Sequence, residues 1–302
     1  MNTTLWFYCL IYLFSRRKLA MRKMISVVLM VVVFALSVTG FACAENTIPG
    51  LEDGVLTVAM ECAYAPYNWA QPDDSNDSVP IKDKAGLYAN GYDVMMAKAI
   101  CEAYGWQLEI VQLDWDSLIP AVLSGIVDAV IAGQSMTAER MEAVDFAGPY
   151  LYATIVCLAK EGNPNTEAKG ISQLKGSATS QSGTIWYDTC LPQVKGANII
   201  PPAESAPAML MALESGTVDF VCTDMPTAQG ALIAYNDLKL LDFAGSGDDF
   251  EVSEEDINIG ISIKKGNTQL LEAINNFLKD KTADDFNALM AKAIEIQPLS
   301  EE

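Results

Sequence analysis

Two stretches far apart in the chain repeat one pattern. Residues 121–130 read AVLSGIVDAV and residues 212–221 read ALESGTVDFV, so they share Ala, Ser-Gly, Val-Asp and the final Val. Each stretch combines the end of a helix, a Ser-Gly stop and a buried strand. A repeated helix–stop–strand unit predicts two similar α/β lobes, with chance similarity of a short pattern as the alternative. Ligands of open α/β sheets bind at the strand ends that such units present.

Short apolar runs alternate with amphipathic segments along the rest of the chain, which is typical of an α/β fold. An acidic, Gly-containing loop is expected at 245–256. The predicted strands are 55–60, 107–113, 127–133, 150–162, 218–224 and 257–263. The predicted helices are 92–105, 116–125, 205–216 and 226–235, with one beginning near Thr184 and others after residue 263.

The first 44 residues have the order of a secretory signal. A basic stretch (15–23) precedes an apolar run (25–41), and small residues follow up to Ala44. We expect cleavage after Ala44 and an extracytoplasmic protein, in the periplasm or at the cell surface. Lipidation of Cys43 is an alternative that would anchor the chain, and a membrane-spanning anchor is another. Met21 is an alternative start, because a second apolar run precedes the basic stretch.

The chain carries a formal net charge of −20, and its first 44 residues contain basic but no acidic side chains. The remainder is therefore more acidic still, which argues against nucleic acid and anionic membrane surfaces as partners. Cationic or zwitterionic ligands suit such a protein, and any bound anionic group needs a local positive site. The sequence has no histidine, which excludes His-based triads, His general bases and His metal ligands.

The cysteines after residue 44 are widely spaced and form no C-x-x-C pair, so we expect no zinc site and no other metal or cofactor. Buried free thiols are the expectation, and a disulfide between an unspecified pair is the alternative. These cysteines are Cys62, Cys101, Cys157, Cys190 and Cys222.

An ordered series of motifs resembles the amino-acid-binding proteins of ABC importers, solute-binding family 3. The motifs are VLTVAMECAYAPYNW, GYDVMMAKAI, WDSLIPAVLSGIVDAVIAGQSMTAER, VDFAGPY, QSGT and VDFVCTD. The resemblance implies a type II periplasmic binding protein, with two α/β lobes joined by two hinge strands around a ligand cleft. It implies lobe 1 at 45–150, lobe 2 at 151–254 and a return to lobe 1 at 255–302, with crossings near 150–154 and 255–259.

Arg140 is the sole arginine after residue 44, and it ends the motif AGQSMTAER. A guanidinium can hold a carboxylate with two parallel hydrogen bonds, which lysine cannot do. The resemblance places the ligand's carboxylate on Gly133, Ser135 and Arg140, with Thr137 capping the short helix that follows. The alternative is that Arg140 pairs with a neighbouring acid on the surface.

Asp224 ends the strand of the second repeat, where the resemblance assigns it to the ligand's α-ammonium group. Its alternative role is the N-cap of the helix that follows, and both roles are compatible. The QSGT motif adds Gln181 and Thr184 to the wall of lobe 2, with the Thr184 hydroxyl near the ligand carboxylate. A plain turn into a helix is the alternative for this motif.

Recognition of the ligand's side chain is expected from Glu61, Tyr64 and Trp115. A cationic or amide side chain could stack on the two rings and reach Glu61. Core packing is the alternative for both rings, and Tyr67 is expected to pack within the lobe. Glu61 stands where relatives often have Asp, and the family's frequent terminal Tyr…Trp-Phe-Gly helix is absent.

The sequence therefore predicts a solute-binding protein without enzymatic activity, for a polar L-amino acid of basic or glutamine-like type. Its partners would be the free amino acid and the membrane permease of an ABC importer, and it is expected to be a monomer. One rival is an enzyme resembling cyclohexadienyl dehydratases, with Glu61 or Asp224 as its acid. The other is a ligand-sensing receptor domain, for which a transmembrane helix and a signalling domain beyond the lobes, or a separate partner protein, are expected.

Overall fold

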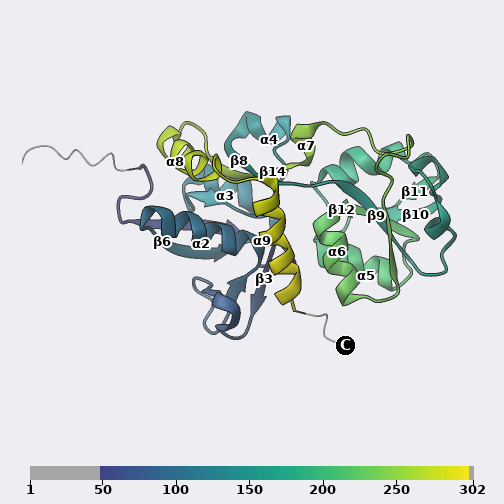
Figure 1. Cartoon of the computed structure of the whole chain (residues 1–302), viewed down its shortest axis with the longest axis horizontal. Coiled ribbons are helices and arrows are strands. Elements are labelled where there is room, and N and C mark those ends of the chain that lie inside the picture. The colour runs from purple at the N-terminus through teal and green to yellow at the C-terminus, as the bar shows by residue number, and fades with distance from the viewer. Residues whose placement is uncertain (1–47, 299–302) are drawn as a thin grey trace, which may run out of the picture. The chain divides into compact units, whose positions relative to one another are not determined.

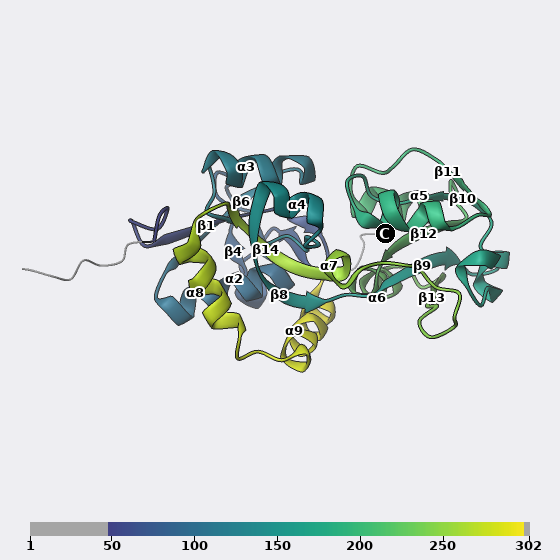
Figure 2. The same ribbon diagram turned by 90° about the horizontal axis from the view of Figure 1, so that it is seen from above.

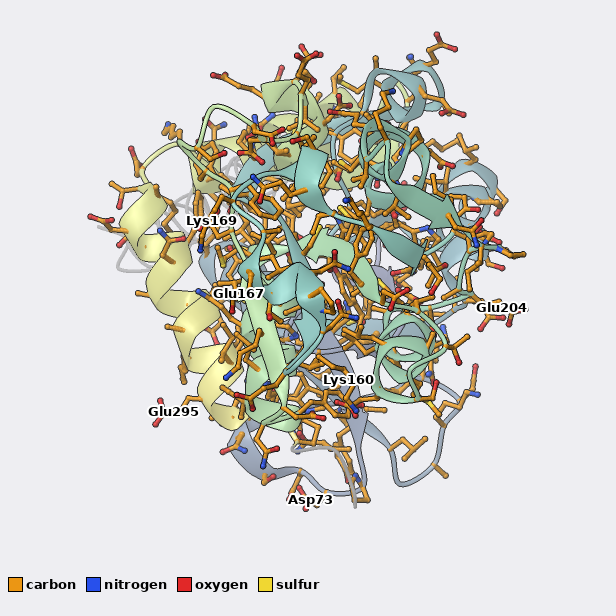
Figure 3. All side chains as sticks on the ribbon, turned by 90° about the vertical axis from the view of Figure 1, so that its right-hand side faces the viewer. Asp73, Lys160, Glu167, Lys169, Glu204 and Glu295 are labelled. Atoms are coloured by element: carbon orange, nitrogen blue, oxygen red, sulfur yellow. The ribbon has the colours of Figure 1, made fainter. Side chains whose placement is uncertain are left out.

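The computed structural model describes residues 48–298, which form two five-stranded sheets and a smaller four-stranded sheet. The predicted signal segment (1–44), Cys43 and Met21 lie outside these residues. Within 48–298, no helix combines the length and the apolar content that crossing a bilayer requires. Exposed acids such as Asp73, Glu204 and Glu295 lie at the outline of the molecule in Figure 3.

The first large sheet has the strand order β6-β1-β7-β14-β8. Its first three strands run parallel, and β14 pairs antiparallel with both β7 and β8. The strands are β6 (Gln107–Gln112), β1 (Val55–Met60), β7 (Ala129–Val130), β14 (Asn258–Lys264) and β8 (Val144–Tyr152). The helices of this lobe are α2 (Tyr92–Tyr104), α3 (Leu118–Ser124), α4 (Ala138–Ala143), α8 (Thr268–Leu278) and α9 (Ala283–Ile296).

The second large sheet has the strand order β11-β10-β12-β9-β13, with β9 antiparallel to both of its neighbours. Figure 1 shows α5 and α6 beside these strands. The strands are β11 (Ala197–Ile199), β10 (Gly176–Thr179), β12 (Phe220–Asp224), β9 (Ile155–Lys160) and β13 (Leu238–Leu241). The helices are α5 (Ala206–Glu214) and α6 (Met225–Ala234). The single turn α7 (Glu254–Ile257) directly precedes β14, where the chain returns to the first sheet.

The two large sheets have equivalent strand orders, and the sequence repeat occupies the same place in each. Residues 121–130 form the end of α3, its stop and β7, while residues 212–221 form the end of α5, its stop and the start of β12. Gly125 and Gly216, which follow the two serines, both have a positive φ (76° and 73°). This correspondence agrees with the prediction of two similar α/β lobes.

Several predicted elements have different bounds in the structure. Residues 150–162 belong to two strands, β8 and β9, because the chain leaves the first sheet between them. The helix expected from Thr184 is a π-helical turn (Trp186–Cys190) followed by a 3-10 turn (Leu191–Gln193). The loop at 245–256 includes most of α7, capped by Ser253.

The sequence patterns missed the short strands. The four-stranded sheet has the order β2-β3-β5-β4, and β13 also had no predicted counterpart. The small strands are β2 (Ala63–Tyr64), β3 (Asn68–Gln71), β4 (Val79–Pro80) and β5 (Tyr88–Asn90). Runs this short show no period that separates a strand from a loop.

The chain crosses between the two large sheets twice, and the two crossing segments are adjacent. Tyr152 at the end of β8 pairs with Asn258 at the start of β14, and Ala153 N–H donates to the Ile257 carbonyl at 3.3 Å. Figure 2 shows β8 and β14 side by side as they extend toward the second sheet. Two adjacent connections restrict the relative motion of two lobes to a hinge.

The five cysteines of the described residues are buried and free, as expected, so no disulfide joins them. Cys157 and Cys222 lie opposite each other on β9 and β12, in the core of the second lobe. Burial raises the pKa of Cys222 well above its ordinary value, with Cys157 and Cys190 adding to the shift. These thiols therefore act as small apolar core groups.

Candidate functional site

Most of the residues predicted for ligand binding surround one small cavity of about 10 Å³. It lies at the strand ends of both lobes, as expected for α/β sheets. Glu61 and Asp224, the other two predicted residues, border it through Gln181 and Tyr64 respectively. The cavity is lined by Tyr64, Trp115, Gly133, Ser135, Arg140, Gln181, Thr184 and Trp186.

Arg140 connects the two lobes without an acidic partner. Its guanidinium donates to the Ser135 carbonyl at 2.8 Å and to the Gly183 carbonyl of the second lobe at 2.9 Å. It also lies 5.3 Å from the centre of the Trp115 ring. None of the ion pairs among the described residues involves Arg140, so the surface pairing that was the alternative to ligand binding is not found.

Burial lowers the pKa of Arg140 to about 10, and the charges of Glu139 and Asp188 only partly offset this effect. Arg140 is partly buried, and a partly buried cation that lacks a hydrogen-bonded anion is unfavourable, so a bound carboxylate would stabilise it. Thr137 caps α4 as predicted, because its side chain accepts the Arg140 N–H at 3.3 Å. The cap fixes the turn from which the arginine side chain extends.

Asp224 combines a structural bond with a contact across the cleft. Its Oδ1 accepts the Thr227 N–H at 2.9 Å, which confirms the N-cap of α6. Its Oδ2 accepts the Tyr67 hydroxyl at 2.7 Å and lies 3.5 Å from the Tyr64 hydroxyl. Burial raises the pKa of Asp224, while the bonds from Thr227 and the two tyrosines lower it. The second oxygen therefore faces the first lobe, where a ligand cation could reach it.

Glu61 and Gln181 face each other from opposite lobes. Glu61 is 7% exposed and Gln181 is 1% exposed, yet Glu61 Oε2 and Gln181 Nε2 each lack a hydrogen-bond partner among the described residues. Burial raises the pKa of Glu61 to about 7; the nearby Gln181 amide lowers it, and the charges of Asp114 and Asp116 raise it further. Buried polar atoms without partners are rare, and in a cleft they indicate a polar ligand.

Gly133 allows two aromatic rings to approach the backbone. Its φ is +63°, and an added Cβ would lie 2.8 Å from Tyr64 Cε1 and 3.0 Å from Tyr67 Cδ1. Its N–H donates to the Tyr150 hydroxyl at 3.1 Å. The open face of Gly133 is thus covered by tyrosines, whereas the sequence reading expected a ligand there.

Ser135, Thr184 and Trp115 complete the wall. The Ser135 carbonyl faces Arg140, and the Thr184 hydroxyl donates to the Gln181 carbonyl at 2.8 Å. Trp115 lies close to the second lobe, since a Cβ on Gly183 would be 3.3 Å from its Nε1. The Trp115 contact spans the two lobes, whereas the bonds of Ser135 and Thr184 each lie within one lobe.

Two residues of the site were missed by the sequence reading. Tyr67 was expected to pack in its lobe; its ring does stack on Tyr64 at 4.7 Å, but its hydroxyl also binds Asp224. Trp186 lines the cavity and lies 6.2 Å from the Tyr64 ring. An aromatic residue two positions after the QSGT motif was the available signal for Trp186. Nothing local distinguishes Tyr67 from a core tyrosine.

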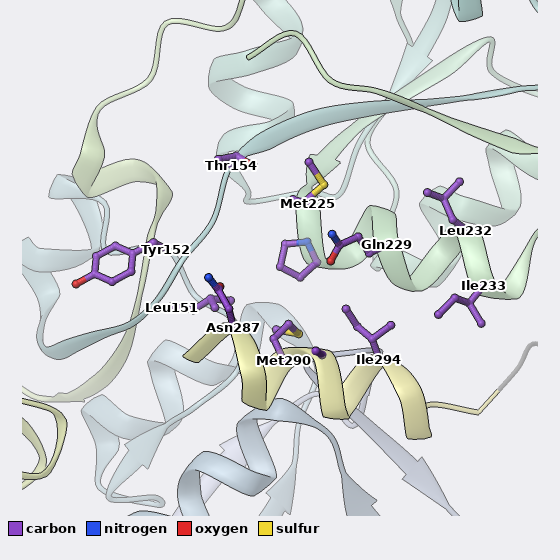
Figure 4. Close-up of a pocket in the computed structure, with 12 residues that line it drawn as sticks. Leu151, Tyr152, Thr154, Met225, Gln229, Leu232, Ile233, Asn287, Met290 and Ile294 are labelled. Atoms are coloured by element: carbon purple, nitrogen blue, oxygen red, sulfur yellow. The ribbon is translucent and has the colours of Figure 1, made fainter. Parts of the chain in front are cut away.

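A larger groove of about 610 Å³ lies outside this site and includes none of the predicted residues. Figure 4 shows Tyr152 from β8, Met225 and Ile233 from α6, and Ile294 from α9 around it. Volume alone would therefore have selected the wrong place. The polar atoms without partners, together with Arg140, mark the small cavity instead.

Comparison with known proteins identifies the class. The profile of the bacterial extracellular solute-binding proteins, family 3, matches residues 56–295. The chain belongs to this family, which confirms the resemblance and the type II periplasmic binding protein fold. Family members are extracellular proteins by name, which agrees with an extracytoplasmic location.

Individual relatives are similar over most of their length. A probable histidine-binding protein of Neisseria gonorrhoeae is 26% identical over 276 residues, which cover 90% of this chain and 95% of that protein. The solved structure of an ancestral arginine-binding protein bound to arginine is 29% identical, with a TM-score of 0.61, covering 79% of this chain and 97% of that one. The ancestral amino-acid-binding protein AncCDT-1, a precursor of cyclohexadienyl dehydratase, is 27% identical, with a TM-score of 0.65 and coverages of 82% and 99%.

Proposed function

We propose that this protein is the extracytoplasmic binding component of an ABC importer and closes its two lobes around a polar L-amino acid. One observation carries the proposal: Arg140, the only arginine among the described residues, is partly buried in the cleft without an acidic partner. Relatives with the same fold include histidine- and arginine-binding proteins.

The amino acid's α-groups would be held between the lobes. Arg140, with Ser135, would bind the carboxylate from lobe 1, and Thr184 would approach it from lobe 2. The Gly133 N–H is taken by the Tyr150 hydroxyl, so the contribution of Gly133 would be the turn that leads to Ser135. Asp224 would accept the ammonium group at the oxygen that now binds the Tyr67 hydroxyl. This arrangement pairs each charge of the ligand with an opposite charge, as burial requires.

The ligand's side chain would lie between Tyr64 and Trp115 and reach Glu61 and Gln181. Glu61 lies close enough to Asp114 and Asp116 for their charges to raise its pKa. A local excess of negative charge favours a cationic side chain, such as that of arginine, lysine or ornithine. An amide side chain, as in glutamine, could also bond both unpaired atoms of Glu61 and Gln181.

Isothermal titration of residues 45–302 against the twenty amino acids, ornithine and cystine tests the proposal. We expect selective one-to-one binding that is lost in Arg140→Ala and strongly weakened in Arg140→Lys, because an ammonium cannot make two parallel bonds. Lys84→Ala, which removes an exposed cation elsewhere on lobe 1, is the control and should bind normally. Parent-like binding by Arg140→Ala would refute the carboxylate role.

The partner would be the importer's membrane permease, which would recognise the closed, ligand-bound lobes. We infer that the protein acts as a monomer and catalyses no reaction. Light scattering with and without ligand tests the first point. Ligand-dependent stimulation of the ATPase activity of a reconstituted importer tests the interaction with the permease.

An enzyme is the second candidate, because AncCDT-1 is similar over most of both chains. Glu61 is a buried acid whose pKa is raised to about 7, which suits a general acid. Such an enzyme would eliminate water and CO₂ from a cyclohexadienyl ring. Growth of aromatic absorbance on incubation with a cyclohexadienyl acid, abolished in Glu61→Gln, would establish this activity; absence of product favours the binding protein.

A further inference from the structure

A buried hydrogen-bond network lies behind the ligand cavity and centres on Asp93, the second residue of α2. Asp93 is 0% exposed, and its Oδ1 accepts the Tyr150 hydroxyl at 2.6 Å while its Oδ2 accepts the Asn68 amide at 2.7 Å. None of the ion pairs among the described residues includes it. A buried carboxylate without a cationic partner is costly, so the bonds it makes must matter to the fold or the site.

Each arm of the network ends on a backbone N–H next to predicted site residues. The Tyr150 hydroxyl accepts the Gly133 N–H at 3.1 Å, in the turn that leads to Ser135. The Asn68 side-chain oxygen accepts the Cys62 N–H at 2.7 Å, directly after Glu61. Asp93 therefore connects two separate walls of the cavity.

The direction of every bond in this network is fixed from its ends. A backbone N–H can only donate, so the Tyr150 oxygen must accept from Gly133 and its proton must point to Asp93. By the same reasoning the Asn68 oxygen faces Cys62, which turns its NH₂ group to Asp93. Both arms deliver a donor to Asp93, and only the ionised carboxylate accepts from both without conflict.

We propose that Asp93 is a positioning residue of the ligand site: its ionised carboxylate holds the Glu61 segment through Asn68 and the Gly133–Ser135 turn through Tyr150. The proposal rests on the proposed function, since these segments carry the residues that would bind the amino acid. Tyr150 also starts the crossing between the lobes, so the network reaches from the site to the hinge.

The network has a titratable centre. Burial raises the pKa of Asp93 to about 7, the bonds from Tyr150 and Asn68 lower it, and the charge of Asp224 raises it further. Cys62 and the tyrosines near Asp93 keep their protons at neutral pH, because burial raises the pKa of Cys62 to about 12 and raises those of Tyr64, Tyr92 and Tyr150. Glu61, whose pKa is also raised to about 7, titrates in the same range, so the pH profile of Asp93→Asn is compared with that of Glu61→Gln. As the pH falls through about 7, protonation of Asp93 would remove one acceptor and weaken ligand binding.

Hydrogen exchange on the ligand-free protein tests the positioning role without any ligand. In Asp93→Asn, the NH₂ group of the new amide faces one of the two donors, Tyr150 or Asn68, and that hydrogen bond is lost. We therefore expect at least tenfold faster exchange at Gly133 or Cys62, with the strands β1 and β6 unchanged. Tyr150→Phe should raise exchange at Gly133 alone. Unchanged exchange at both amides, or a uniform increase across the lobe, would overturn the proposal.

Titration with L-arginine, with the other amino acids as a panel, tests the consequence for the site. We expect Asp93→Asn to weaken binding at least tenfold at pH 8 and to show a shallower loss of affinity between pH 8 and 6 than the parent. Combining it with Tyr150→Phe should cost less than the two separate losses together, because both act through one chain of bonds. Asp83→Asn, an exposed charge on the same lobe, is the matched control.

The outcomes separate the two proposals. If the parent binds no amino acid, the proposed function fails, while the exchange experiment still decides the role of Asp93. If the parent binds and Asp93→Asn binds equally well with an unchanged pH profile, the positioning role is wrong and the function stands. If Asp93→Asn fails to fold, Tyr150→Phe must still show the Gly133 effect.

Discussion

The two repeats place an aspartate in the same position of each lobe, and it makes the same bond. Asp128 Oδ2 accepts the Thr57 N–H on β1 at 2.9 Å, and Asp219 Oδ2 accepts the Ser177 N–H on β10 at 2.7 Å. Both lie one residue before equivalent pairs, Val58 with Ala129 and Ala178 with Phe220. The aspartate of the shared Val-Asp pair thus connects two neighbouring strands in each lobe.

The surroundings of these two aspartates differ. Asp219 also accepts the Ser177 hydroxyl at 2.9 Å and the Asn163 amide at 3.1 Å, and the bonds from Ser177 and Asn163 lower its pKa. Burial raises the pKa of Asp128, and nearby acids including Asp53 add to the rise. The same type of hydrogen bond is therefore made by one aspartate whose pKa is lowered and one whose pKa is raised.

The repeats diverge at the strand ends, three residues past each match. The first lobe has Gly133 there and the second has Asp224, and both border the candidate ligand site. Shared positions build the lobes, and unlike positions at the strand ends build the site. Substitutions at matched pairs can test this division of roles.

Asp224→Asn should have the largest effect, on binding. It removes the charge that would meet the ligand's ammonium, and loss of a charged bond of this kind costs about 3 kcal/mol, or roughly 100-fold in Kd. Asparagine is as good an N-cap as aspartate, so the thermal midpoint should change little. Titration calorimetry measures the loss, with the exposed Glu204→Gln as control (Figure 3). Normal binding by Asp224→Asn would remove this residue from the site.

Gly133→Ala should come next. Its positive φ and the 2.8 Å approach of Tyr64 Cε1 to an added Cβ predict a loss of about 2–4 kcal/mol in the free energy of unfolding. Gly125→Ala has a similar φ (+76°) without a close neighbour and is the matched control. Denaturant unfolding measures both, and equal losses would show that the tyrosine contact is unimportant.

The two aspartates should respond to amide substitution with opposite signs. Asp219 has a lowered pKa, so its stabilisation is present above the unfolded value of about 3.9 and is lost as the pH falls further. Asp219→Asn should therefore lower the unfolding free energy at pH 7 by about 1–2 kcal/mol. The raised pKa of Asp128 means that its charge destabilises the fold at pH 7, and this penalty disappears as the pH falls.

Asp128→Asn should accordingly raise the unfolding free energy at pH 7 by about 0.5 kcal/mol, an effect that vanishes in acid. Thermal unfolding at pH 7 and pH 4 of both variants gives the comparison. Two changes of equal sign at pH 7 would contradict the electrostatic difference between the lobes.

The smallest difference is expected where the repeats agree. Gly125→Ala and Gly216→Ala each place a side chain at a positive φ in open surroundings, so both should lose about 1 kcal/mol. The two stops also share a backbone bond, from Gly125 N–H to Val122 and from Gly216 N–H to Leu213. Chemical denaturation of both variants checks the equality; losses that differ by more than twofold would show that the two stops are not equivalent.

Much of the fold followed from local sequence. The strand at 55–60 and the helix ending at Gly105 have their predicted bounds because each carries a full period of apolar residues and a clear stop. The strand at 238–241 and the sheet formed by β2 to β5 did not follow, because two to four residues cannot show a period. Their pairing depends on neighbours far away in the chain.

The sequence by itself determined the two α/β repeats, their stops, and the one arginine after residue 44, which follows the first repeat by ten residues. It could do so because helix periods, glycine stops and the count of arginines are local or compositional properties. Only the tertiary structure decided that Tyr67 bonds Asp224, that Gln181 faces Glu61, and that Asp93 links both walls of the cavity. Those contacts join residues that are far apart in the sequence. They could not be predicted locally, because the whole fold determines which distant segments pack together.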